Sequence, residues 1–170
     1  MKKYLFYFLL FALSFNAFKV TAQRQLKKHD FSTLEVVSPI TTNGSVTASD
    51  PQNGVSFVDD DKVQIIIKFS REVITSSVIV GSTLLLAFAK EANADATLSW
   101  SDGNKTLTVI TKKKFSDLKG ATTDQFFRLT LKGTAGIKIG VQATNSHYLY
   151  GNGKSEKEGG TYNLYYTFIN

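Results

Sequence analysis

Apolar side chains recur at every second residue in several short segments, and this period of two limits the fold more than any other feature. The clearest case is VQIIIKF, residues 63–69. Successive side chains of an extended strand point to opposite sides, so alternate residues share a face. One face of this segment carries Val63, Ile65, Ile67 and Phe69. The pattern predicts a central strand with one face buried in a core.

Other segments rich in Val, Ile, Thr, Leu, Tyr and Phe are separated by clusters of Gly, Asn, Asp and Ser, which is typical of an antiparallel β domain. The clear ones are residues 63–69, 82–89, 96–100, 106–111, 126–132 and 161–169, with weaker ones at 33–37, 54–58 and 136–141. Residues 82–89 are continuously apolar and could also form a short helix, but the preceding Gly81 and their short length favour a strand. We therefore expect an all-β sandwich of about seven or eight antiparallel strands in two facing sheets.

A β-hairpin is predicted where residues 96–100 and 106–111 flank an Asp-Gly pair, Asp102 and Gly103. Asp-Gly between alternating apolar runs is a strong short-range hairpin signal. Trp100 shares a face with Leu98, so we expect it to pack into the core rather than to serve as a platform for a ligand.

The N-terminus has the three parts of a secretory signal peptide. Two lysines precede an apolar run at residues 4–15, and small residues end at Ala22, after which cleavage is expected. The alternative, an uncleaved membrane anchor, is disfavoured because Asn16 and Lys19 break a run that is shorter than the roughly 20 residues of a spanning helix. The expected organisation is a signal peptide at 1–22, a flexible lead-in at 23–32 and one β-sandwich domain at 33–170.

Export without cysteine suggests a bacterial envelope protein that is secreted, periplasmic or on the cell surface. Without a thiol there is neither a disulfide nor a lipoprotein anchor. Removal of Lys2, Lys3 and Lys19 leaves 17 basic against 14 acidic side chains, a net charge of +3. This is an ordinary surface charge, and the single lysine run, residues 112–114, is interpreted as a solvated edge after a strand. We therefore expect neither nucleic acid as a partner nor a transmembrane span after cleavage.

No catalytic or metal-binding constellation is recognisable in the sequence. The acidic run 59–61 is interpreted as a solvated turn, because adjacent side chains of an extended chain diverge. His29 and His147 have no cysteine to form a common metal pattern with, and no G-x-S-x-G elbow presents a serine nucleophile. The sequence thus predicts no enzyme, no cofactor and no metal.

Tyrosines crowd the last quarter of the chain and are the remaining candidates for a binding surface. Tyr162 and Tyr166 share the apolar face of the last predicted strand. Tyr165 falls on the opposite face, and Tyr148 and Tyr150 lie beside a Gly-rich loop. These last three are the candidate ligand-binding residues, with the alternative that they simply cover a sheet surface.

Several sequence segments resemble those of the bacterial immunoglobulin-like domains of S-layer and other surface proteins. They are VVSPITTNG at residues 36–44, IKFSREV at 67–73, WSDGNKTLTV at 100–109, FRLTLKGTAGIK at 127–138, and the Gly-rich loop with the closing strand at 148–168. The resemblance implies an immunoglobulin-like sandwich. It also implies a calcium loop rich in Asp, but residues 151–154 carry a Lys and only Glu156 and Glu158 lie nearby, so a calcium site is not expected.

These observations lead to a functional expectation drawn mainly from the resemblance. The chain is expected to be a non-enzymatic exported immunoglobulin-like module that takes part in adhesion or other binding at the cell envelope. Its partner would be an envelope or extracellular protein or a glycan. The alternative is a carbohydrate-binding module in which Tyr148, Tyr150 and Tyr165 stack on sugar rings.

Overall fold

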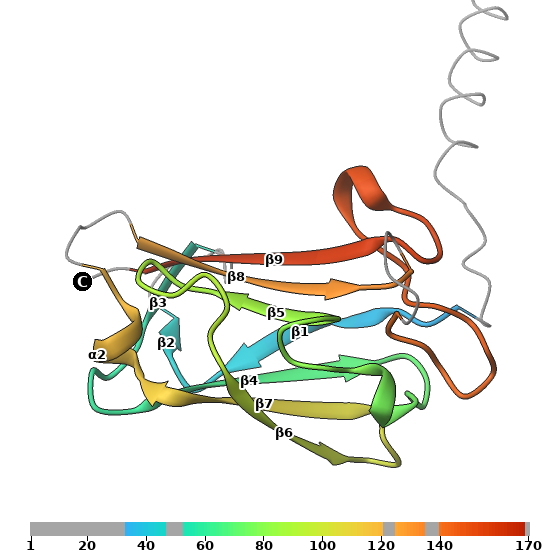
Figure 1. Cartoon of the computed structure of the whole chain (residues 1–170), viewed down its shortest axis with the longest axis horizontal. Helices are drawn as coiled ribbons and strands as arrows, with labels where there is room; N and C mark the ends of the chain where they lie inside the picture. The colour runs from blue at the N-terminus through green and yellow to red at the C-terminus, as the bar shows by residue number, and fades with distance from the viewer. Residues whose placement is uncertain (1–32, 47–52, 121–124, 135–139, 169–170) are drawn as a thin grey trace, which may run out of the picture. The chain divides into compact units, whose positions relative to one another are not determined.

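The computed structural model describes residues 33–46, 53–120, 125–134 and 140–168. In this part of the chain nine strands form two sheets that lie one above the other, which confirms the predicted all-β sandwich (Figure 1). The predicted signal peptide and lead-in, and most of the weak strand at 136–141, fall outside the described residues. No helix in the described ranges is long and apolar enough to cross a membrane.

The four-stranded sheet has the order β1-β4-β7-β6, and all its pairs are antiparallel. Its strands are β1 (Val36–Thr42), β4 (Lys62–Phe69), β6 (Ala96–Ser101) and β7 (Thr106–Lys114). The predicted central strand is β4, which lies between β1 and β7. Its alternate residues Val63, Ile65 and Ile67 have no exposed surface, as their two-residue spacing predicted.

The five-stranded sheet has the order β2-β3-β9-β8-β5. Its strands are β2 (Ser45–Val46), β3 (Asn53–Ser56), β5 (Leu84–Ala87), β8 (Gln125–Lys132) and β9 (Thr161–Phe168). The sheet is antiparallel except for β3 and β9, which pair in parallel. This pair departs from the prediction of a wholly antiparallel fold. It joins segments from opposite ends of the domain, and no local sequence pattern predicts such a pairing.

The core between the sheets is built around Phe127 of β8, which is completely buried. Its ring stacks on Phe88 with 5.1 Å between centroids and lies 6.2 Å from the ring of Phe57. Phe57 in turn lies 5.2 Å from Phe115, the first residue of the short helix α2 (Phe115–Leu118) that follows β7. The aromatic cluster therefore links the two sheets.

The first strand begins later than predicted and is irregular. Residues 33–37 were expected to form it, but β1 starts at Val36, and Leu34 forms an isolated bridge with Leu149. The pairing of β1 with β4 shifts register between Val37 and Thr41. Pro39 lies in this interval and has no N–H to donate, which is tolerated because β1 is at the edge of its sheet.

The lysine run lies within β7 and not after it, and each of its side chains forms an exposed ion pair. The pairs are Lys112 with Asp95 at 2.5 Å, Lys113 with Glu91 at 2.7 Å and Lys114 with Asp60 at 2.9 Å. The hydrogen bonds to Glu91 and Asp60 raise the pKa of the respective lysines, and the Lys112 bond lowers the pKa of Asp95. Exposed pairs of this kind contribute little to stability.

Tyr162 provides a test of the inward face of β9 at alkaline pH. Burial raises the pKa of its phenol, because the charged form loses solvation. The pKa of Tyr162 is therefore higher in the folded protein than in the unfolded chain. The contribution of the neutral phenol to stability is fully present below about pH 10, and it is lost as the pH rises through the folded-state pKa. We expect Tyr162→Phe to reduce the decline in unfolding free energy above about pH 10. Urea denaturation across the alkaline range would measure it.

The matched control is Tyr165→Phe, because Tyr165 lies on the same strand with 51% of its surface exposed. This control is expected to follow the wild-type decline. If Tyr162→Phe declines as steeply as the wild type, then Tyr162 is not buried on the inner face of β9.

Candidate functional site

Three loops meet at one end of the sandwich, around the segment that follows β4. On one side of this segment lies the turn between β6 and β7. The Phe69 N–H donates to the Lys105 carbonyl at 2.8 Å, and the Val73 N–H donates to the Asn104 carbonyl at 3.1 Å. These two bonds hold the tip of the β6–β7 hairpin against residues 69–73.

The other side of the same segment is held to a turn at residues 143–147. The Thr144 N–H donates to the Glu72 carbonyl at 3.1 Å, and the Ile74 N–H donates to the Gln142 carbonyl at 2.9 Å. Val73 also forms an isolated antiparallel bridge with Ala143. The segment after β4 is therefore fastened by its backbone on both sides, so the side chains that it carries are presented on a fixed frame.

The predicted hairpin is confirmed, with a four-residue turn between Ser101 and Thr106. Asp102, Gly103 and Asn104 have positive φ angles of 53°, 58° and 61°. Asp, Asn and Gly are the residues that adopt this left-handed conformation most readily. The turn directs the Asn104 and Lys105 carbonyls onto the segment after β4, and this contact places Lys105 at the site. Trp100 stacks on Phe69 with 6.0 Å between centroids and packs against the core as predicted.

Ser70 fastens the start of the domain to the same end. Its hydroxyl accepts a hydrogen bond from the Glu35 N–H at 2.9 Å and donates to the Thr33 carbonyl at 3.0 Å. The Ser70 N–H also donates to the Glu35 carbonyl at 2.9 Å. The role of this serine is therefore to hold the wall of the site.

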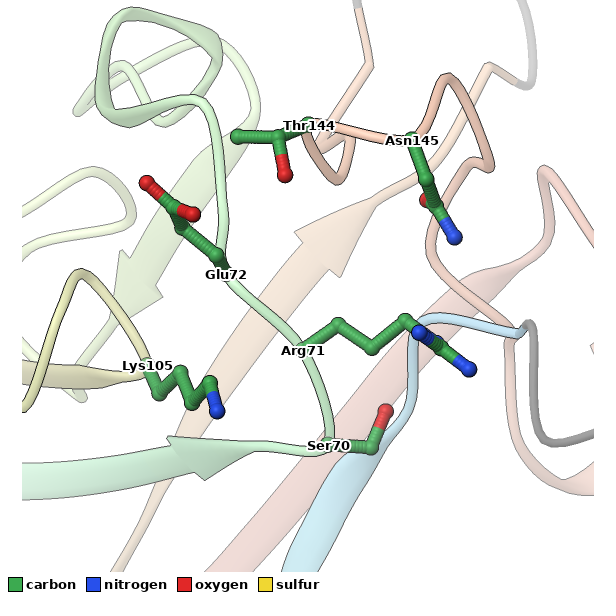
Figure 2. Close-up of a pocket in the computed structure, with 6 residues that line it drawn as sticks. All are labelled: Ser70, Arg71, Glu72, Lys105, Thr144 and Asn145. Atoms are coloured by element: carbon green, nitrogen blue, oxygen red, sulfur yellow. The ribbon is translucent and has the colours of Figure 1, made fainter.

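These loops enclose an open pocket of about 260 Å³ (Figure 2). Its lining consists entirely of polar residues: Ser70, Arg71, Glu72, Lys105, Thr144 and Asn145. In Figure 2 the side chains of Arg71 and Lys105 lie on opposite sides of the segment after β4. The carboxylate of Glu72 points away from both cations. The pocket therefore has two separate cationic positions and one acidic position.

Neither cation of the pocket has a carboxylate partner among the described residues. The Nε of Arg71 is buried and has no hydrogen-bond acceptor in that part of the chain. In the described part of the chain, the carboxylate of Glu72 receives one long bond, from the Asn104 side-chain amide at 3.5 Å. Buried donors are almost always paired in folded proteins, so an unpaired guanidinium N–H in a pocket is a feature that a bound acceptor would explain.

The structure does not bring the three candidate tyrosines onto one element. Tyr165 lies on β9, opposite Arg128 of β8, and is half exposed. Tyr148 and Tyr150 are both half-buried and flank the fully buried Leu149 on a separate extended segment. Tyr148 lies at the base of the turn that carries Thr144 and Asn145, since it bridges to Gln142. Tyr148 thus neighbours a pocket wall, Tyr150 bridges to Glu158, and Tyr165 belongs to the sheet surface.

Glu158 ties the late Gly-rich loop to this turn. One of its carboxylate oxygens accepts from the Tyr148 N–H at 3.0 Å and lies 3.0 Å from Nδ1 of His147. His147 is therefore half-buried beside a carboxylate rather than free in solvent. Glu158, one of the two acidic residues considered for a calcium loop, is engaged in these contacts.

Two of the three carboxylates in the acidic run at 59–61 pair with lysines. Asp59 lies 2.6 Å from the ammonium of Lys119, and Asp60 pairs with Lys114. Across the described ranges, no three His, Asp or Glu side chains gather in a way that could hold a metal ion. The pocket of Figure 2 differs from these clusters because it contains a buried hydrogen-bond donor, the Nε of Arg71, that has no acceptor in the described part of the chain.

Sequence reasoning missed the pocket as a site, although two of its components were singled out. The hairpin turn was predicted from Asp-Gly, and IKFSREV was noted for its resemblance to surface-protein domains. The pocket joins residues 70–72, residue 105 and residues 144–145. These positions are distant in sequence, and their meeting depends on the backbone bonds described above.

Comparison with known proteins does not assign the chain to a group. No protein-family model and no curated protein matches it. The fold and the pocket therefore carry the functional argument.

Proposed function

We propose that the chain is a non-enzymatic, exported interaction module of the bacterial cell envelope, of the immunoglobulin-like kind that the sequence resembles. It binds a protein or glycan through the loops at the end of the sandwich that carries the pocket. The observation behind this proposal is the buried Nε of Arg71, which has no acceptor among the described residues and belongs to a polar pocket whose loops are fastened to one another. Binding sites on β-sandwiches commonly lie on such loops, because the sheets provide a rigid support.

The pocket is suited to binding rather than to catalysis. Its hydroxyl groups are those of Ser70 and Thr144, and the Ser70 hydroxyl is already engaged by the backbone of residues 33 and 35. Nucleophilic catalysis needs a hydroxyl beside a base that is itself oriented, and the lining contains no histidine. Two cations, a carboxylate and an amide instead provide donors and acceptors for a partner.

Binding to isolated bacterial envelope fragments tests the proposal. The chain is expressed with its leader, and the exported product is labelled, mixed with the fragments and sedimented. We expect saturable binding. The double variant Arg71→Glu with Lys105→Glu should bind at least about ten-fold more weakly, because charge reversal places repulsion where a polar contact was. Lys62→Glu, at the opposite end of β4 from Phe69, is the matched control and should bind as the wild type does.

Two results would contradict this proposal. One is the absence of saturable binding, and the other is an equal loss with Lys62→Glu. The carbohydrate-binding alternative is supported by the half-exposed Tyr165. It is tested by repeating the binding experiment with Tyr165→Ala. Loss of binding with this variant, together with normal binding of the double variant, would move the site to the surface of β9.

A further inference from the structure

We propose that the pocket recognises an acidic sugar residue, with Arg71 binding its carboxylate. This inference rests on the proposed function, since it names the ligand class of the same site. Three features of the pocket support it: the buried, unpaired Nε of Arg71, a second cation on the other side of the same segment, and a carboxylate in the same lining.

The guanidinium of Arg71 identifies an oxyanion as part of the ligand. Arginine presents its N–H donors in a planar fork that matches the two oxygens of a carboxylate. The residue is half-buried, its buried Nε has no acceptor, and no carboxylate pairs with it in the described part of the chain. A ligand carboxylate would supply the acceptors that the protein does not.

The position of Lys105 favours an extended ligand over a compact ion. Lys105 reaches toward the Ser70–Glu72 backbone from the β6–β7 turn, whereas Arg71 extends from that backbone to its other side, so the two charged groups lie on opposite sides of it (Figure 2). A small free anion would be held best by convergent donors. A ligand that lies across the segment, with its carboxylate at Arg71 and other oxygens toward Lys105, can contact both cations.

The acidic corner of the pocket indicates that the ligand also carries hydroxyl groups. The Glu72 side chain points away from both cations (Figure 2), and in the described part of the chain its carboxylate receives one side-chain hydrogen bond, from Asn104 at 3.5 Å. Its carboxylate can accept hydrogen bonds from sugar hydroxyls. The same charge repels a ligand that carries many adjacent negative charges, such as a run of acidic side chains.

The all-polar lining argues further against a protein partner at this pocket. The main energetic anchors of protein interfaces are Trp, Tyr and Arg in desolvated pockets, and the six lining residues include Arg71 but no aromatic residue. A volume of about 260 Å³ lies just below the usual range of small-molecule sites, which fits one or two sugar units. A singly charged, hydroxylated ligand satisfies the charges and the polarity together.

The test is calorimetric titration of the exported protein with an oligosaccharide that contains glucuronic acid, with the methyl ester of that oligosaccharide, and with a polyglutamate peptide of similar length. We expect binding of the acid form and at least about ten-fold weaker binding of the ester, since a charged hydrogen bond is removed. Arg71→Gln should weaken binding of the acid form roughly ten- to hundred-fold. Arg71→Lys should recover only part of the loss, because it keeps the charge without the fork.

Lys62→Gln removes the same charge far from the pocket and is expected to leave the affinity unchanged, and thermal unfolding of each variant verifies that it is folded. Equal binding of acid and ester, or an equal effect of Lys62→Gln, overturns the inference. Preference for polyglutamate would identify an acidic protein partner and also overturn it. If envelope fragments bind but none of these ligands does, the sugar assignment fails and the proposed function stands. If the fragments do not bind either, both fail.

Discussion

Replacing Phe127 by alanine is expected to lower the free energy of unfolding by about 3–5 kcal/mol, the usual cost of truncating a fully buried phenylalanine. The ring has no exposed surface and contacts the rings of Phe88 and Phe57. Its removal deletes apolar burial and leaves a cavity where the two sheets are joined, and rigid surrounding strands can close such a cavity only in part. Urea denaturation followed by tryptophan fluorescence would measure the loss.

The matched control for this variant is Arg128→Ala, the next residue of β8, whose side chain is exposed on the opposite face. Its effect should stay within about 0.5 kcal/mol, as for ordinary surface substitutions. The loss of unfolding free energy for Phe127→Leu should lie between the losses for Phe127→Ala and Arg128→Ala. A loss below about 1 kcal/mol for Phe127→Ala would mean that the ring is not at the centre of a packed core.

Replacing Gly160 by alanine is expected to destabilise the domain by about 3 kcal/mol through overlap with backbone atoms. An added Cβ would overlap the carbonyl oxygen of Ser155 and lie 2.8 Å from that of Lys157. The Gly160 N–H already donates to Lys157 at 3.0 Å, and its carbonyl accepts from the Gly133 N–H at 2.9 Å. The backbone cannot move aside without breaking these bonds, so the overlap is not relieved cheaply.

Gly153→Ala is the informative comparison, since Gly153 lies in the same loop but has open space where the Cβ would be. Its φ of 60° is left-handed, so alanine there should cost only about 1–2 kcal/mol of backbone strain. Urea denaturation of both variants distinguishes the cost of steric overlap at Gly160 from the cost of backbone strain at Gly153. Equal losses, or a smaller loss at Gly160, would show that the loop is not packed against Gly133 and Lys157 as described.

Much of the sandwich was predictable because a strand's inward face is a local property. The alternation in residues 63–69 and at Phe127, Leu129 and Leu131 of β8 identified side chains that are buried in the structure. The hairpin was predictable for the same reason, since Asp102 and Gly103 specify their own backbone conformation. The start of β1 was not, because Leu34 is buried by its bridge to the distant Leu149.

The candidate site was less predictable than the fold. Tyrosines were chosen because their side chains suit binding, yet Tyr165 lies on a different element from Tyr148 and Tyr150. Sequence reasoning did not single out Arg71 or Lys105. They matter because the Nε of Arg71 is buried without a partner in the described part of the chain and because both residues line one pocket. Neither property can be predicted from residue type or spacing.

The sequence by itself determined that apolar residues alternate in short segments, where the chain turns, and therefore that two sheets bury a common core. Those outcomes depend on interactions between neighbours in the chain. Only the tertiary structure decided that the segment after β4 lies between the β6–β7 turn and the 143–147 turn, and that β3 pairs in parallel with β9. Such contacts join segments far apart in sequence, and their selection depends on how the whole core packs.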